Sequence, residues 1–101
     1  MQIKGVKGTH DLYGDESYCY DYIENIFSIV AELYNYKKIE TPCLEYTEVF
    51  SRGTGTSSDV VRKEMYTFLD KGDRSVTLRP EGTAGVMRSI VENKLYATND
   101  L

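Results

Sequence analysis

The sequence has few of the residues that build metal sites, disulfide frameworks or membrane spans. Its 101 residues include no tryptophan, one histidine and two cysteines. No apolar run approaches the ~18 residues that a membrane span needs, so we expect no contact with a membrane. Lysine and arginine number 12 against 16 acidic residues, and the net charge of −4 provides no basic surplus for gripping phosphate backbones.

The cysteines and the histidine do not form a recognisable ligand pattern. Cys19 and Cys43 lie outside any Cys-x-x-Cys pair, and His10 is the single histidine, so we expect no metal site. The first residues have neither an apolar core segment nor a small-residue cleavage site, which predicts no secretory signal and a cytoplasmic protein. Both cysteines are therefore predicted to be reduced core thiols.

Two stretches have the periodicity of amphipathic helices. The first follows residues 15–17, two acids and a serine that we expect to precede and cap it, and it stops at Asn35. Its apolar residues recur at spacings of one, three and four: Tyr22, Ile23, Ile26, Phe27, Val30, Leu33 and Tyr34. The second stretch covers residues 83–95, with Gly82 or Thr83 as its cap.

Extended segments are predicted on either side of the middle of the chain. Residues 36–41 read as a short strand that Pro42 ends, and residues 43–50 fit a short helix or an irregular crossing equally well. Residues 64–70 and 74–80 alternate in polarity and are joined by Lys-Gly-Asp, which predicts a β-hairpin. This order of elements indicates an α+β fold with an antiparallel sheet flanked by helices.

The glycine-rich segment at residues 51–59 only superficially suggests a phosphate-binding loop. A dinucleotide fingerprint needs a third glycine where Ser58 stands, and the Gly-Lys of a Walker loop does not occur there. We therefore predict a mobile surface loop, with a lid as its functional variant. Residues 1–14 read as an arm laid across a larger body, and the lack of a closing element after residue 97 indicates part of a domain.

The most informative cluster is Thr-Leu-Arg-Pro-Glu-Gly-Thr at residues 77–83. A strand is predicted to end here and a helix to begin, so Glu81 and Thr83 would be held at a rigid corner. A carboxylate and a hydroxyl in that arrangement can bind an ammonium group. The alternative is an ordinary helix N-terminus, in which both side chains serve as caps, and spacing alone favours that alternative.

Several segments resemble one family, the histidyl-tRNA synthetases, which are class II aminoacyl-tRNA synthetases. Residues 77–83 and Lys-Glu-Met-Tyr-Thr-Phe at 63–68 resemble two family segments, and Lys-Gly-Thr-His-Asp-Leu at 7–12 resembles its opening signature. The first helix, the strand after it and Pro42 look like class II motif 1. The resemblance makes residues 1–101 the N-terminal portion of the class II catalytic domain, without the anticodon-binding domain.

The resemblance implies ATP-dependent activation of histidine to histidyl-adenylate, followed by transfer to tRNA(His), with Mg²⁺ expected alongside ATP. The family's α-ammonium-binding residues map onto Glu81 and Thr83, which reverses the preference for a purely structural role. No residue of this sequence is implied to be catalytic. Motif 1 implies a homodimer, and because the family's ATP-phosphate arginines lie downstream, we expect a catalytically incomplete fragment.

Two other functions stay open. One is the histidine-binding regulatory subunit of ATP phosphoribosyltransferase, a synthetase paralogue whose corresponding segment commonly has Asp in place of Glu81 and lacks the glycine. The other is a pure dimerisation module, which would self-associate without binding histidine. The sequence also departs from the family pattern, with Gly14 near a common proline and Gly-Thr-Ser at residues 55–57 in place of Gly-Glu-Thr.

Overall fold

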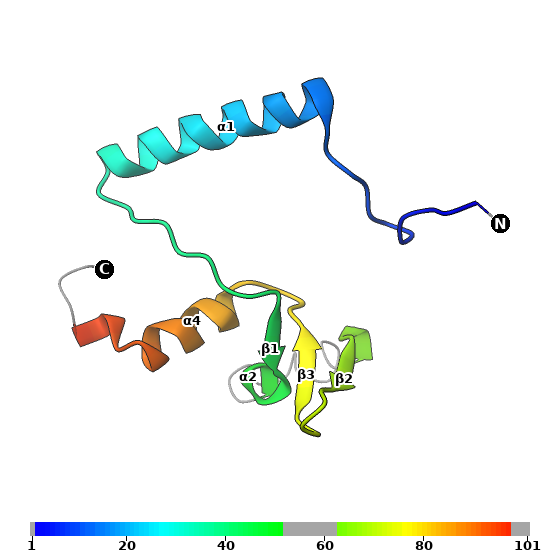
Figure 1. Cartoon of the computed structure of the whole chain (residues 1–101). Coiled ribbons are helices and arrows are strands. Elements are labelled where there is room, and N and C mark those ends of the chain that lie inside the picture. Colours follow the sequence, from blue (N-terminus) through cyan, green and yellow to red (C-terminus); the bar gives the residue numbers. More distant parts are fainter. Residues whose placement is uncertain (1, 52–62, 98–101) are drawn as a thin grey trace. The chain divides into compact units, whose positions relative to one another are not determined.

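A computed structural model describes residues 2–51 and 63–97 of the chain (Figure 1). The chain divides into two compact units, Met1–Lys38 and Ile39–Leu101. The predicted loop at 51–59 lies outside the described residues except for Ser51, which is the last residue of a short helix.

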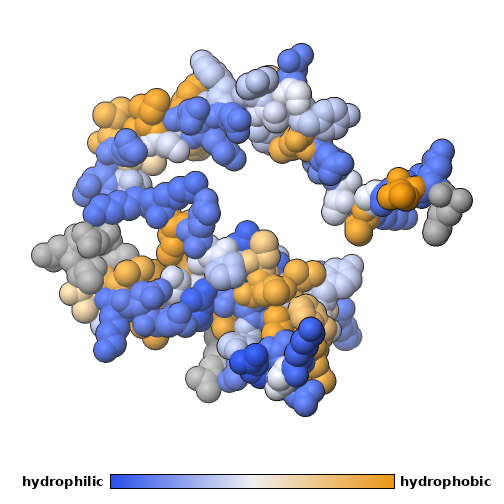
Figure 2. Space-filling model, viewed as in Figure 1, coloured by the Kyte–Doolittle hydropathy of each residue, from blue (hydrophilic) through white to orange (hydrophobic). Residues whose placement is uncertain are grey.

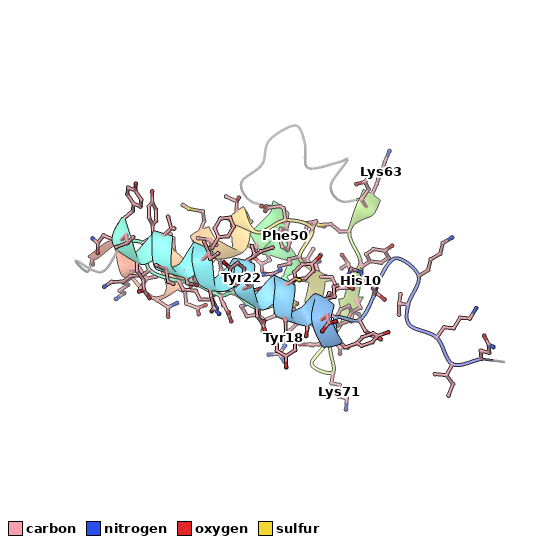
Figure 3. The ribbon with its side chains drawn as sticks, turned by 90° about the horizontal axis from the view of Figure 1, so that it is seen from above. His10, Tyr18, Tyr22, Phe50, Lys63 and Lys71 are labelled. Atoms are coloured by element: carbon pink, nitrogen blue, oxygen red, sulfur yellow. The ribbon has the colours of Figure 1, made fainter. Side chains whose placement is uncertain are left out.

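The first unit consists of an extended arm and helix α1, Gly14–Leu33. His10 lies in the arm (Figure 3). The acidic residues 15 and 16 occupy the first turn of α1. Ser17 is not the cap, because its hydroxyl donates to the Gly14 carbonyl at 2.8 Å within the helix. Gly14 has φ +62°, a left-handed conformation that glycine adopts without steric cost, and the helix begins there, earlier than predicted.

Helix α1 stops where the sequence predicted. Asn35 has φ +64° and its backbone N–H donates to the Glu32 carbonyl at 3.0 Å, while the N–H of Tyr36 donates to the Ala31 carbonyl at 2.8 Å. These two bonds form a Schellman motif, which satisfies carbonyls that the helix end would otherwise leave without donors.

The apolar stripe of α1 is exposed. The structure describes every residue of this helix and none of them is buried; Phe27, for example, is 72% exposed. The other six residues of the predicted stripe are exposed as well: Tyr22, Ile23, Ile26, Val30, Leu33 and Tyr34. Exposed apolar surface is also visible elsewhere on the molecule, in orange in Figure 2.

The second unit is built on a three-stranded antiparallel sheet with strand order β1-β3-β2. Its elements are β1 Leu44–Tyr46, α2 Thr47–Ser51, β2 Thr67–Leu69, β3 Ser75–Leu78, α4 Thr83–Glu92 and the 3₁₀ turn η2 Leu95–Ala97. The segment at 43–50, which the sequence left open, is a strand that runs directly into a helix.

The strand predicted at residues 36–41 is wrong, because the first strand begins only after Pro42. Leu44 pairs with Leu78, and the N–H of Arg79 donates to the Cys43 carbonyl at 2.9 Å, so the ladder ends just after the proline. The residues of a segment show whether it can be extended but not whether it finds a partner strand. The position of that partner fixes β1.

The predicted hairpin is present with shorter strands. Its turn is closed by backbone bonds from Asp70 to the Arg74 carbonyl at 2.9 Å and from Asp73 to the Asp70 carbonyl at 3.0 Å. Asp73 has φ +60°, and Lys71 lies at the tip (Figure 3). The Asp70 carboxylate accepts the N–H groups of Gly72 and Arg74, both at 2.9 Å, and orders the turn from within.

The core of this unit is small and partly polar. Phe50 of α2 and Val76 of β3 are buried, and Thr77 of the central strand is fully buried. The Thr77 hydroxyl is 2.9 Å from the hydroxyls of both Thr47 and Thr67, which joins β3 to α2 and β2. Leu78 is exposed, so β3 does not bury the alternate residues predicted from its sequence.

Candidate functional site

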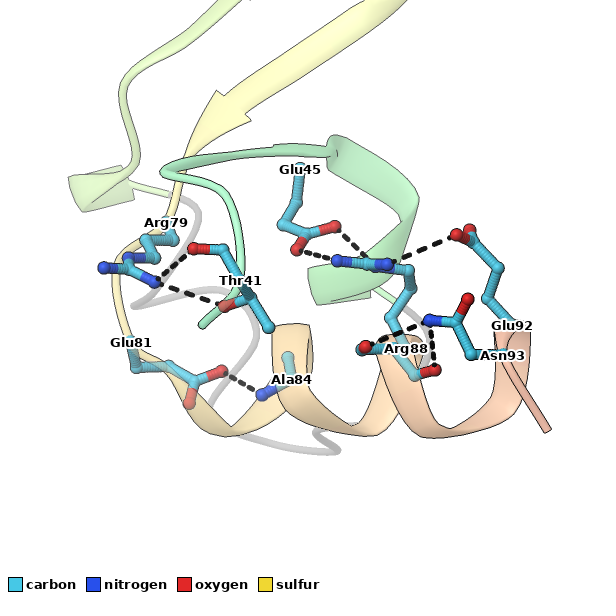
Figure 4. A network of polar contacts seen from close by, with 9 residues as sticks. Thr41, Glu45, Arg79, Glu81, Ala84, Arg88, Glu92 and Asn93 are labelled. Carbon is cyan, nitrogen blue, oxygen red and sulfur yellow. Dashed lines mark hydrogen bonds and ion pairs between the residues drawn. The ribbon is translucent and has the colours of Figure 1, made fainter. Parts of the chain in front are cut away.

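The candidate site is the corner where β3 leads into α4. The Glu81 carboxylate accepts hydrogen bonds from the backbone N–H groups of Thr83 at 2.6 Å and Ala84 at 3.0 Å; Figure 4 shows the second. Gly82 occupies the N-cap position of α4 and contributes no side chain. Glu81 therefore caps the helix, so the structural alternative raised by the sequence is correct for Glu81, whereas Thr83 is the first residue of α4 and not its cap.

Capping does not use up the hydrogen-bonding capacity of this carboxylate. Each oxygen of an ionised carboxylate can accept about two hydrogen bonds, and each oxygen of Glu81 accepts one from the backbone. Its side chain is exposed, and it lies at the helix end where the macrodipole favours a negative charge. Glu81 can thus hold the helix end and receive a cation at the same time.

Thr83 lies on the wall of a cavity of about 710 Å³. The cavity is formed between the segment before β1 and the start of α4, and its lining residues are Ile39, Glu40, Thr41, Cys43, Arg79, Gly82, Thr83 and Val86. Glu81 is not among them. The structure therefore places the two predicted residues on one corner, with only Thr83 facing the cavity.

Arg79 fastens this corner to the segment that precedes β1. Its Nη1 atom donates to both the carbonyl and the hydroxyl oxygen of Thr41, each at 3.2 Å (Figure 4). The sequence places Arg79 in the cluster at residues 77–83 but gives no sign of this contact. The structure shows that it bridges two segments separated by 38 positions.

A partly buried ion pair lies beside the corner, and sequence reasoning missed it. Arg88 of α4 donates from Nε to Oε1 of Glu45 at 3.0 Å and from Nη2 to Oε2 at 2.9 Å (Figure 4). The Glu45 side chain is 5% exposed and that of Arg88 is 25% exposed. The hydrogen bonds to Glu45 raise the pKa of Arg88 above its ordinary value, against the opposing effect of burial. The guanidinium also approaches Glu92, with Nη1 3.5 Å from Oε1.

Gly85 lets α4 pass close to this pair. A Cβ at Gly85 would lie 3.0 Å from Oε2 of Glu45 and 3.4 Å from Oγ1 of Thr41. The first distance is shorter than a carbon and an oxygen tolerate without one of them moving. The α4 backbone thus lies close to the Glu45 carboxylate, and a side chain at position 85 would need this carboxylate to shift by a few tenths of an ångström.

Three further expectations from the sequence concern metal ligands, the two cysteines and membrane spans. Within residues 2–51 and 63–97, no group of three or more His, Cys, Asp or Glu side chains could hold a metal ion. Cys19 and Cys43 are free and exposed, so their assignment to the core is wrong. None of the described helices is long and apolar enough to cross a membrane.

The chain is similar to known histidine–tRNA ligases. The family described as Histidyl-tRNA synthetase matches residues 8–99. A histidine–tRNA ligase of Clostridioides difficile strain 630 is 52% identical over 97 residues, and one of Staphylococcus epidermidis is 59% identical over 93 residues. These matches cover 96% and 92% of this chain but only 23% and 22% of the relatives, so the chain spans less than a quarter of their length.

Solved structures share the fold. The apo histidyl-tRNA synthetase of S. aureus superposes with a TM-score of 0.81 at 45% identity, covering 99% of this chain and 23% of that protein. A Bacillus halodurans protein described as an ATP phosphoribosyltransferase regulatory subunit/histidyl-tRNA synthetase gives 0.74 at 23% identity, covering 100% and 26%. The first match and the antiparallel sheet with its helices confirm the predicted α+β fold.

Proposed function

Because this chain belongs to the histidyl-tRNA synthetase family, we propose that it serves in the ligation of histidine to tRNA(His). Its fold is part of a class II aminoacyl-tRNA synthetase catalytic domain, as the sequence predicted. In the proposed reaction, a carboxylate oxygen of histidine attacks the α-phosphorus of ATP. The bond to pyrophosphate breaks, and histidyl-adenylate forms. A hydroxyl at the 3′ end of the tRNA then attacks the acyl carbon, the bond to AMP breaks, and the histidyl group passes to the tRNA.

We propose that Glu81 and Thr83 bind the α-ammonium group of histidine. The observation that carries this proposal is the Glu81 carboxylate, which two backbone N–H groups hold at the start of α4 and which retains acceptor capacity. Thr83 adds a hydroxyl acceptor on the wall of the adjoining cavity. Holding the amine leaves the substrate carboxylate free to attack, so both residues orient the substrate and neither transfers a proton.

Histidine-dependent exchange of pyrophosphate into ATP, measured on the full-length protein that carries this chain, tests the assignment. Glu81→Gln removes the charge of a charge-assisted bond, which corresponds to a roughly 10- to 100-fold loss of kcat/KM for histidine. The control is Asp73→Asn, the same carboxylate-to-amide change in the hairpin turn, where asparagine tolerates the left-handed φ. A Glu81→Gln enzyme with unchanged kinetics for histidine would refute the assignment.

The chain by itself is expected to be inactive. In the family, the arginines that hold the ATP phosphates follow the segments matched here, and stabilising that charge is usually the largest catalytic effect. We propose that residues 1–101 form the N-terminal portion of the catalytic domain and that the anticodon-binding domain lies outside them. Measurable histidine-dependent exchange of pyrophosphate into ATP by residues 1–101 alone would contradict this proposal.

We also propose a homodimer and Mg²⁺ as the companion of ATP. The exposed apolar stripe of α1 supports a homodimer formed through motif 1, because a second copy would bury it. Mg²⁺ is proposed to accompany ATP; the described residues offer no metal-ligand cluster, so no step is assigned to the ion. A cytoplasmic location remains a prediction from the sequence.

The regulatory subunit of ATP phosphoribosyltransferase is the less favoured function. The Bacillus halodurans protein shares the fold, but 23% identity carries no argument about activity. The ligase relatives are 52–59% identical, and residue 81 is Glu rather than the Asp common in the paralogue. The exchange assay separates the two functions, because a regulatory subunit would bind histidine without exchanging pyrophosphate.

A further inference from the structure

The corner that carries Glu81 and Thr83 is fastened at both ends to the segment around β1. Before the corner, Arg79 donates to the carbonyl and hydroxyl of Thr41. After it, Arg88 forms its two-bond pair with Glu45 (Figure 4). The proposed substrate-binding residues therefore lie between two anchors on one neighbouring segment.

Close backbone contact strengthens the second anchor. Gly85 lies between Thr83 and Arg88, and its missing side chain lets the first turns of α4 rest on the Glu45 carboxylate. Glu45 belongs to β1, whose register with β3 is fixed by the pairing of Glu45 with Thr77. A rotation or shift of α4 would break both guanidinium bonds and press its backbone against β1.

The distinctive contribution of the Glu45–Arg88 pair is to the orientation of α4 and not to the free energy of unfolding. A guanidinium and a carboxylate bind through two parallel bonds only when their planes are aligned, so the pair fixes orientation as well as distance. Two apolar side chains of similar volume usually stabilise a buried site at least as well, which leaves geometry as the distinctive contribution. Binding sites need such support, because small displacements of their contact atoms weaken recognition.

We infer that the Glu45–Arg88 pair is a positioning element, which sets the first turn of α4 so that Glu81 and Thr83 meet an ammonium group in one orientation. This inference rests on the proposed function, since it concerns the same corner. Arg88 also neutralises Glu45, whereas Glu81 is bonded to neutral backbone N–H groups. The pair acts through α4 and does not touch the substrate.

The test compares two competitive ligands in the exchange assay on the full-length protein. Histidinol retains the ammonium group of histidine, and 3-(4-imidazolyl)propionate lacks it. Arg88→Lys keeps the charge but loses the two-bond fork, and we expect it to raise the inhibition constant of histidinol about tenfold, in the range that a small misplacement costs. The constant for imidazolylpropionate and the KM for ATP should stay within about twofold of wild type.

The hairpin supplies a matched control. Arg74→Lys makes the same change in the Asp70–Arg74 pair, whose Nε–Oδ2 distance is 2.9 Å, and should leave both inhibition constants unchanged. If Arg88→Lys does not fold, Glu45→Met/Arg88→Met decides instead, since it leaves no buried charge without a partner, and the same selective loss is expected.

Two results would overturn the inference: equal weakening of both ligands in the Arg88 variants, which signals general damage, or no weakening of either. The proposed function fails separately, if the wild-type protein shows no histidine-dependent exchange or if Glu81→Gln leaves histidinol binding intact.

Discussion

Replacing Arg88 with methionine would leave the Glu45 carboxylate buried without its charged partner. The Glu45 side chain is only 5% exposed, and both of its oxygens are bonded to Arg88. Breaking a buried pair in this way typically costs about 3–5 kcal/mol of unfolding free energy. The Arg88 side chain is 25% exposed and also contacts Glu92, so we expect the lower end of the range, about 3 kcal/mol.

Glu45→Met/Arg88→Met should recover most of that loss. The double variant removes both charges and fills their space with apolar atoms, a change that is often neutral or stabilising. The coupling energy from the cycle of single and double variants is then about 2–3 kcal/mol, near the upper end for residues in direct contact. This outcome would show that the single variant is destabilised by an unpaired charge.

Hydrogen exchange of the α4 backbone amides, followed by mass spectrometry on the full-length protein, measures the effect locally. A loss of about 3 kcal/mol lowers the protection of these amides on the order of 100-fold. The α1 amides of residues 14–33, which belong to the other unit, provide an internal reference in each variant. If the double variant were as poorly protected as Arg88→Met, the cost would come from lost packing, and reasoning from the unpaired carboxylate would be refuted.

Three further predictions concern single positions. Gly85→Ala should lower the free energy of opening of α4, measured by amide exchange, by about 1 kcal/mol. Crowding of the new methyl group against Glu45 costs about 1–3 kcal/mol, which outweighs a gain of about 1 kcal/mol in helix propensity. Unchanged protection of the α4 amides would contradict this. The pKa of Asp70 is lowered from its ordinary value of 3.8, mainly by the hydrogen bond from the backbone N–H of Arg74. The ionised Asp70 carboxylate therefore stabilises the hairpin above pH 3.8, and this stabilisation is lost as the pH falls through the lower pKa of the folded state. Hairpin protection measured down that pH range should therefore decline in wild type and stay flatter in Asp70→Asn. Asn35→Gly should keep the end of α1 intact and Asn35→Val should fray it, as amide exchange at residues 30–36 would show; equal protection would refute the role assigned to the left-handed residue.

Features that depend on neighbouring residues were predictable from the sequence. The end of α1 at Asn35 and the hairpin turn at residues 70–74 follow from side chains and conformations within a few positions. The start of α1 was misplaced because a serine after two acids is typical of a cap, whereas the turn into the helix is made by the left-handed Gly14.

Features that depend on distant partners were not predictable in this way. Residues 36–41 were predicted to form a strand, yet β1 forms at Leu44–Tyr46, where β3 supplies a ladder. Glu45 and Arg88 are 43 positions apart, and an acid in a short strand and an arginine in a helix carry no local sign of pairing. The periodicity of apolar residues indicates which apolar side chains are buried. It gives no sign of Glu45 and Arg88, because these charged side chains leave the solvent only as an ion pair.

The corner at residues 79–83 lies between these cases. Its strand-to-helix geometry was predictable, and the structure shows Glu81 capping α4. The assignment of Glu81 and Thr83 to an ammonium group came from the resemblance to a family, because spacing alone favoured the cap. Both roles use the same carboxylate, which explains why local reasoning could not separate them.

The fully buried Thr77 has a consequence for how the second unit comes apart. Its hydroxyl carries one hydrogen and can donate to only one of Thr47 and Thr67, so at least one of these two hydroxyls must donate to it. Thr47 also meets the Ser75 hydroxyl at 2.7 Å, so four oxygens form one row across two strands and a helix. Detaching α2 or β2 removes one of the two hydrogen-bond partners of the buried Thr77 hydroxyl. We expect this sheet to melt in a single step, with no strand detaching ahead of the rest.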